Sequence, residues 1–224
     1  MLAQLPMYQQ AILLLASLVL FSSFTLLAQT RVVSIVQAFA WQGALVAITT
    51  ALVAYDLGLH HLYISAILTL VLKAGFIPWL LLRLIRQMGL DREVHTVEHP
   101  VVTMMIATAL VIFCYYVAQP IEQMTSTITR NTIAISMAVV LLGMLMLVSR
   151  NKAVSQVVGF MSLENGLFFA AVSATHGMPM VVELGIAFDV LIAAVIFGVF
   201  FFHIRDSFDS LDVSQLSHLS EMDE

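Results

Sequence analysis

Long apolar segments separated by shorter polar ones run along the whole chain. Seven of them have about 17 to 25 residues, the length that a helix needs to cross a hydrocarbon core of about 30 Å. They lie at residues 6–28, 32–55, 61–84, 100–118, 131–149, 153–175 and 180–203. Most links between them are short, so consecutive helices should be antiparallel neighbours. The pattern predicts an all-α integral membrane protein, a bundle of seven transmembrane helices.

The composition agrees with a location in a lipid bilayer. Hydrophobic residues make up 61% of the chain and charged residues only 10%, and the mean hydropathy is +0.99. Much of the formal net charge of −5 comes from an acidic C-terminal tail, which we interpret as solvated. Residues 1–10 contain no Lys or Arg, and no convincing small-residue cleavage site follows them. We therefore expect a retained first helix and not a signal peptide.

The distribution of basic residues predicts the orientation. Because the number of spans is odd, the two termini should lie on opposite sides of the membrane. A periplasmic N-terminus leaves only Arg130 outside and places seven basic residues on the cytoplasmic side of a bacterial inner membrane, as the positive-inside rule requires. These seven are Arg31, Arg83, Arg86, Arg92, Arg150, Lys152 and Arg205.

The polar links divide the chain into four parts. These are an N-terminal three-helix half with a cytoplasmic loop (1–99), a connecting helix with a periplasmic loop (100–130), a second three-helix unit (131–204) and the acidic cytoplasmic tail (205–224). The two three-helix units share a spacing: His60 precedes Lys73 by thirteen positions, as His176 precedes Asp189. Parallel repeats occur in transporter folds, and one here would set Lys73 and Asp189 at matching depth. Chance could also produce such a spacing.

Three charged residues, Lys73, Glu164 and Asp189, lie about midway along predicted spans. An ionised side chain at the bilayer centre costs about 2.5–3.5 kcal/mol on insertion scales, so such residues usually face a bundle interior or a hydrated path. They indicate proton or ion movement through the protein.

Glu164 lies in the most polar stretch of any predicted span. Ser162 and Asn165 flank it and need partners in protein or water, and Gly159 and Gly166 would allow close helix approach or a local π-type distortion. We identify Glu164 as the first candidate for a proton carrier. The alternative is a protonated glutamic acid that serves as a hydrogen-bonding strut between helices.

Lys73 stands a turn and a half before Pro78, which should kink the helix. Snorkelling is the alternative role for Lys73, but about ten residues, or ~15 Å, separate it from either end of its span. A desolvated lysine beside an acid forms the simplest proton switch. Asp189 is a second candidate acid, and Glu183 lies near the periplasmic end of the same span, where it could also be an ordinary interfacial charge.

The sequence predicts no cofactor bound by this chain. One cysteine, Cys114, cannot build an iron–sulfur cluster or a thiolate zinc site, and the histidines fall at helix ends, in loops or in the tail, which disfavours a bis-histidine haem. We predict no metal site and no nucleic-acid partner. His176 and His203 could take up and release protons at the two ends of the last helices, or simply cap the surface.

Three sequence runs resemble one known family. Residues 159–166 (Gly-Phe-Met-Ser-Leu-Glu-Asn-Gly), 182–189 (Val-Glu-Leu-Gly-Ile-Ala-Phe-Asp) and 211–216 (Leu-Asp-Val-Ser-Gln-Leu) look like hydrogenase-4 component E, the HyfE family, as does the segment around Lys73 and Pro78. More loosely, residues 149–202 resemble the three-helix NuoK subunit of respiratory complex I and the MrpC subunit of multisubunit antiporters. Glu164 lies about one turn farther from the Arg-Asn turn than in the NuoK pattern, and the second acid is Asp189.

The resemblance implies a membrane-arm subunit of a complex I-like hydrogenase, of the group 4 nickel–iron or formate hydrogenlyase type. It implies that the Ni–Fe centre and Fe–S clusters belong to partner subunits, and that the chain binds antiporter-like (NuoL/M/N-like) membrane-arm subunits and peripheral-arm subunits. Glu164, Asp189 and Lys73 would then exchange protons, with Glu183 near the outer opening. The alternatives are a stand-alone or Mrp-type cation/proton antiporter subunit and a purely structural scaffold.

Overall fold

The computed structural model describes residues 7–58, 60–87, 100–120, 127–174, 185–196 and 198, and all the regular elements in these ranges are helices. They are α1 (Met7–Ala28), α2 (Val32–Leu57), α3 (His60–Thr69), the π-helical segment η2 (Leu70–Phe76), α4 (Ile77–Gln87), α5 (Pro100–Ala118), α6 (Thr127–Ser149) and α7 (Ala153–Ala174). A shorter apolar helix follows at Gly185–Ile196, which we call the 185–196 helix. The prediction of an all-helical chain is confirmed for the described residues.

Five helical spans in the described ranges are long and apolar enough to cross a membrane. They are α1, α2, the continuous α3–η2–α4 rod, α5 and α6, which match the first five predicted segments. The sixth predicted segment forms α7, which has 22 residues but a polar centre. The seventh is described only over the 185–196 helix. The chain is therefore a membrane protein, while its full helix count and orientation stay predictions.

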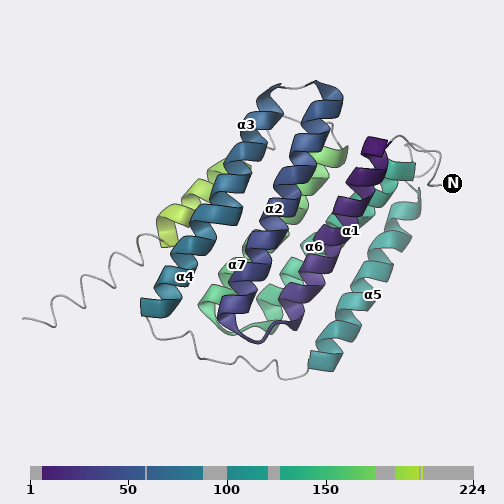
Figure 1. Cartoon of the computed structure of the whole chain (residues 1–224). Helices are drawn as coiled ribbons and strands as arrows, with labels where there is room; N and C mark the ends of the chain where they lie inside the picture. The colour runs from purple at the N-terminus through teal and green to yellow at the C-terminus, as the bar shows by residue number, and fades with distance from the viewer. Residues whose placement is uncertain are drawn as a thin grey trace, which may run out of the picture.

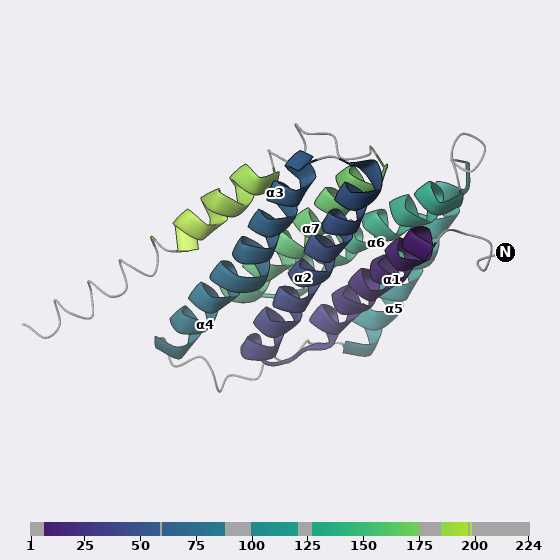
Figure 2. The same ribbon diagram turned by 45° about the horizontal axis from the view of Figure 1, so that its top comes forward.

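The helices form one bundle, in which successive membrane spans run in opposite directions (Figure 1). Helix pairs joined by short links lie side by side, as predicted: α1 with α2, α2 with α3, and α6 with α7. Helix α5 instead packs against α1 and α6, at the opposite flank of the bundle from α4, as both views of the ribbon show (Figure 2). Helix α7 packs against both α6 and α2.

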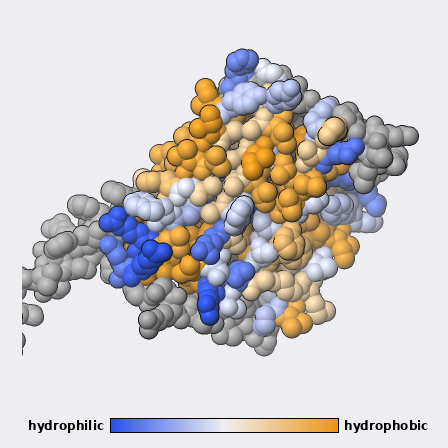
Figure 3. Space-filling model, in the orientation of Figure 1, coloured by the Kyte–Doolittle hydropathy of each residue, from blue (hydrophilic) through white to orange (hydrophobic). Residues whose placement is uncertain are grey.

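The basic side chains gather at one end of this bundle. Arg31, Arg86, Arg150 and Lys152 all lie where α1, α4 and α6 end and α2 and α7 begin, and we call this the basic end. In the space-filling view the face around the bundle centre is largely hydrophobic, and hydrophilic residues collect where α4 ends (Figure 3). On α4, Arg83 lies over the Trp79 ring at 5.4 Å, an arrangement that suits a membrane–water interface.

Two glycines allow α6 and α7 to pack at close range. A Cβ atom at Gly143 would lie 2.6 Å from the Leu163 backbone nitrogen, and one at Gly166 would lie 2.8 Å from the Val140 backbone nitrogen. Small residues at such contacts are a common basis of helix association in membranes. Close approach is therefore the role that the structure shows for Gly166.

The π-type distortion that the sequence allowed in α7 lies elsewhere. Helix α7 is α-helical from end to end, whereas the π segment η2 lies in the third span and contains Lys73. Pro78 has no N–H to donate to the carbonyl four positions back, and the N–H of Ile77 bonds to the Leu72 carbonyl, five positions back. The proline therefore explains why the helix is widened at this point.

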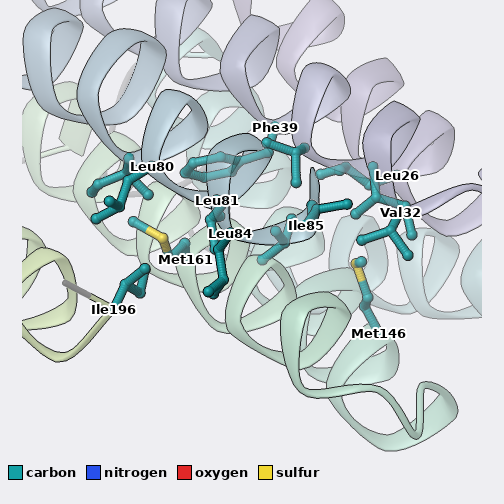
Figure 4. Close-up of a cluster of buried hydrophobic side chains, with 14 of the residues drawn as sticks. Leu26, Val32, Phe39, Leu80, Leu81, Leu84, Ile85, Met146, Met161 and Ile196 are labelled. Atoms are coloured by element: carbon teal, nitrogen blue, oxygen red, sulfur yellow. The ribbon is translucent and has the colours of Figure 1, made fainter. Parts of the chain in front are cut away.

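The apolar core is divided into two clusters, one toward each end of the bundle. The cluster nearer the basic end includes Leu26, Val32, Phe39, Leu80, Leu81, Leu84, Ile85, Met146, Met161 and Ile196 (Figure 4). The other includes Ile12, Ala16, Val19, Val46, Val53, Leu62, Ile135, Val139, Phe168, Phe169 and Val172. Along α2, the third span and α7, the polar residues Gln42, Lys73 and Glu164 come at the point where the chain passes from one cluster to the other. The bundle thus holds a polar layer between two apolar ones.

Candidate functional site

Three ionisable side chains meet in the polar layer. The Lys73 Nζ atom lies 3.0 Å from Glu164 Oε1 and 3.3 Å from Asp189 Oδ1. The three come from η2, α7 and the 185–196 helix, which are far apart in sequence. We call this group the charged trio. The structure therefore brings together the three residues that the sequence identified at mid-span.

The charged trio is shielded from the surface. Relative exposure is 0% for Lys73, 6% for Glu164 and 1% for Asp189. Because the ammonium is fully buried, the structure excludes the snorkelling alternative for Lys73 in this conformation. The contacts are at ion-pair distance, yet Lys73 Nζ, both Glu164 carboxylate oxygens and Asp189 Oδ1 lack a hydrogen bond of good geometry. Among the described residues, the trio is thus held mainly by the attraction between opposite charges.

Helix α2 and η2 position the lysine. A Cβ atom at Gly43 would lie 2.9 Å from Lys73 Cβ and 3.2 Å from the Lys73 carbonyl carbon, so only glycine lets η2 lie this close to α2. The ammonium also lies 5.5 Å from the centroid of the Phe168 ring, close enough for a cation–π contact. Phe168 follows Glu164 by one helical turn on α7, so the two present a carboxylate and an aromatic face to the same cation.

A glycine also brings the second acid close. A Cβ atom at Gly185 would lie 3.2 Å from Phe168 Cδ2 and 3.4 Å from Glu164 Oε1. The 185–196 helix therefore approaches α7 at the level of the trio, and Asp189 follows one turn later on the same helix.

A second polar group, which we call the polar relay, adjoins the trio. Asn165 Nδ2 donates to Gln42 Oε1 at 3.2 Å, and Gln42 Nε2 donates to Ser23 Oγ at 2.8 Å. Ser23 Oγ in turn donates to the Val19 carbonyl at 3.1 Å. The relay connects α7, α2 and α1. Asn165 Oδ1 has no hydrogen-bond partner and is buried.

Gln42, Ser23 and Phe168 were not identified from the sequence. Gln42 could have been found, because an uncharged amide in the middle of a span needs a buried partner as Asn165 does. Ser23 gave no signal, since serines in membrane helices usually bond to their own backbone. Phe168 is one of 14 phenylalanines in an apolar chain, and only the fold shows which of them faces a cation.

Arg150 holds segments of the chain together at the basic end. Its Nη2 donates to the carbonyls of Leu27 and Gln29 at 2.8 and 2.7 Å, and Gln156 Nε2 donates to the Arg150 carbonyl at 2.9 Å. Burial lowers the pKa of the Arg150 guanidinium from its usual value. The α6–α7 turn is thereby tied to the last carbonyls of α1, where a cation also opposes the negative end of the helix dipole. Arg150 belongs to the Arg-Asn turn singled out in the sequence, and its observed contacts are structural.

The other predicted site residues lie apart from the trio or outside the described residues. Ser162 is buried in α7, but none of the described hydrogen bonds joins it to the trio. Glu183, His176 and His203 lie outside the described residues. Within the described ranges, no three His, Cys, Asp or Glu side chains lie close enough together to hold a metal ion.

Comparison with known proteins found the uncharacterized protein Rv0085 of Mycobacterium tuberculosis (strain ATCC 25618 / H37Rv). It is 32% identical over 189 residues, which is 84% of this chain and 86% of that protein. The chain belongs to the Rv0085 family. No protein-family model matches the chain, and no solved structure matches it.

This member of the Rv0085 family is also similar to hydrogenase-4 component E. Identity to the protein of that name from Escherichia coli (strain K12) is 28% over 120 residues, or 54% of this chain and 56% of that protein. The same values hold for the proteins of E. coli O157:H7 and Shigella flexneri. The match thus spans about half the length of these relatives. The match supports the assignment of this chain to membrane proteins that resemble a hydrogenase subunit.

Proposed function

We propose that this chain is a membrane-arm subunit of a hydrogenase-4-like complex, and that the charged trio is a proton-carrying step coupled to electron transfer in partner subunits. The observation that carries the proposal is the trio itself: one buried ammonium within 3.0 and 3.3 Å of two buried carboxylates, between two apolar clusters. The similarity to hydrogenase-4 component E supplies the setting.

The charge balance of the trio gives it a proton to move. With all three groups ionised its net charge is negative, and one added proton on either carboxyl makes it neutral. A buried site favours the neutral state, because an uncompensated charge away from water is costly. One proton can therefore be shared by Glu164 and Asp189 around Lys73. A change in charge on a neighbouring subunit would load or release this proton.

The wider pathway is part of the same proposal. Glu183 would lie near the outer opening, His176 and His203 would take up or release protons at the two ends, and Ser162 and Asn165 would support Glu164. Protons are the proposed ion, because the Lys73 ammonium occupies the position that a sodium ion would need between the two carboxylates.

The assembly is proposed on the same basis. The Ni–Fe centre and Fe–S clusters would reside in peripheral-arm subunits, and antiporter-like subunits would adjoin this chain in the bacterial inner membrane. In the four-part division of the sequence, residues 131–204 would be the NuoK-like unit, and they include the two acids of the trio.

The test compares proton translocation with electron transfer in inverted membrane vesicles that contain the whole complex. The variants are Glu164→Gln, Asp189→Asn and Lys73→Met, each of which keeps side-chain volume and removes a titrating or charged group. Translocation per hydrogen turned over should fall severalfold, while the assembled complex and its hydrogenase activity are kept. The matched control is Thr50→Val, which removes a buried hydroxyl that bonds only to the Val46 carbonyl of its own helix.

The outcomes separate the three candidate roles. Loss of assembly in the trio variants would favour a structural scaffold, if no variant assembles normally and loses translocation alone. Unchanged translocation in all three would overturn the proton-carrying role. Purification of the native chain without any hydrogenase subunit, but with cation/proton exchange in liposomes, would favour an antiporter.

A further inference from the structure

Of two consecutive residues of α2, one contacts Lys73 and the other contacts Asn165, the neighbour of Glu164. Gln42 accepts a hydrogen bond from Asn165, the neighbour of Glu164 on α7. Gly43 lies against the backbone of Lys73 in η2. The relative positions of the ammonium and the carboxylate therefore depend on one short stretch of a helix that carries no charge at this level.

We propose that Gln42 is the positioning residue of the Lys73–Glu164 pair, and that it acts through the polar relay of Asn165, Gln42 and Ser23. The proposal rests on the proton-carrying role of the trio. It assigns a function to an uncharged residue whose described hydrogen bonds go to Asn165 and Ser23 and not to the trio.

The hydrogen bonds of the relay run in one direction. The Asn165 amide donates to Gln42, the Gln42 amide donates to Ser23, and Ser23 donates to the Val19 carbonyl. The orientations of the two amides are thereby linked, since reversal of Gln42 alone would set donor against donor and reversal of Asn165 alone would set acceptor against acceptor. Gln42 has a relative exposure of 0%, so no solvent competes for these bonds.

The relay helps to fix the rotation of α7, together with the close packing of α7 against α6. Adjacent residues on a helix point about 100° apart, so a bond that holds Asn165 toward α2 also holds Glu164 at a set angle from it. That angle is the one at which Glu164 Oε1 lies 3.0 Å from Lys73 Nζ. Neither carboxylate oxygen of Glu164 has a hydrogen-bond partner of good geometry among the described residues. Its orientation therefore depends in part on how its neighbours on α7 are held.

Positioning should alter how the trio titrates. The charged groups that face Glu164 are Lys73 from η2 and Asp189 from the 185–196 helix. In their described parts, α2 and α6 add no charged side chain at this level. If the Lys73–Glu164 distance lengthens, the attraction weakens and the shared proton is held over a different pH range. Such a change distinguishes a positioning role from a general loss of stability.

The experiment measures the pH profile of proton translocation per hydrogen turned over, in vesicles that contain the whole complex. Gln42→Met keeps the length of the side chain and removes both bonds. Its profile should shift by about half a pH unit or more, a size that reflects a modest change in one close charge pair. Ser23→Ala should shift the profile in the same direction. Ser22→Ala is the matched control, because Ser22 also donates to the Val19 carbonyl but takes no part in the relay.

A double variant keeps the test decisive. If Gln42 acts through Asn165, adding Asn165→Leu to Gln42→Met should move the profile little further than either change alone. Full additivity, or a Gln42→Met profile equal to that of Ser22→Ala, would overturn the positioning role. If Gln42→Met reduces the amount of assembled complex, the profile of the remaining complex still decides, since it is normalised to hydrogen turnover. Glu164→Gln in the same vesicles tests the proton-carrying role separately, so the two proposals fail in different experiments.

Discussion

Gly43 is the residue that allows Lys73 to sit against α2. The Lys73 backbone lies where a side chain on residue 43 would be, and a membrane interior offers no water-filled space into which either helix could shift at low cost. The position of the ammonium therefore depends on the absence of one methyl group.

We expect Gly43→Ala to push η2 away from α2 and to destabilise the protein by about 1–3 kcal/mol, the usual cost of overpacking. Gly75→Ala is the matched control, because its added Cβ would find only the Leu70 carbonyl oxygen, at 4.0 Å. Thermal unfolding of the purified protein in mild detergent measures the difference. Equal unfolding temperatures for the two variants would show that α2 and η2 are not in close contact.

Among the elements, η2 has the most direct effect on the trio. A π segment holds one more residue than an α-helix of the same length would, so it rotates α3 relative to α4 by about 100° from their positions in a regular helix. Lys73 lies inside this segment, between Leu62 in one apolar cluster and Leu80 in the other. The widened helix thus turns the lysine toward the acids while both flanking faces remain in the core.

Pro78→Ala restores an N–H that can bond to the Ala74 carbonyl, and we expect it to favour a regular α-helix over η2. Lys73 would then turn away from Glu164, and translocation per hydrogen turned over should fall severalfold, with assembly retained. The same vesicle assay measures it, with Pro100→Ala at the start of α5 as a comparison that leaves the third span untouched. A Pro78→Ala variant that translocates normally would show that the proline does not maintain η2.

At the scale of the whole molecule, the basic end predicts how the chain lies in the membrane. In a Cys114→Ala background, His60→Cys should react with a membrane-impermeant maleimide added to spheroplasts, because His60 is exposed at the end opposite the basic one. Asn151→Cys, exposed at the basic end, should react only after the membrane is permeabilised. The reverse pattern would invert the predicted orientation.

The sequence predicted the spans and the trio for one reason: a bilayer penalises every polar group, so length and hydropathy locate helices and isolated charges locate the interior. Lys73, Glu164 and Asp189 could therefore be identified without a structure. Their distances could not, because those depend on helix rotation, which Gly43 and η2 set through packing. A π-type distortion was one of two roles predicted for Gly159 and Gly166 in α7, whereas the π segment lies in the third span, before the hydrogen bond that Pro78 cannot make.

The separation of the trio along the chain also has a consequence for biosynthesis. Glu164 follows Lys73 by 91 positions, and Asp189 follows it by 116. At a synthesis rate of about 5–20 residues per second, the lysine is made roughly 5 to 20 s before its counter-ions. During that time the third span carries an unpaired cation, at a cost of about 2.5–3.5 kcal/mol on insertion scales. The ion pairs of the third span can therefore form only after α7 and the 185–196 helix have been made.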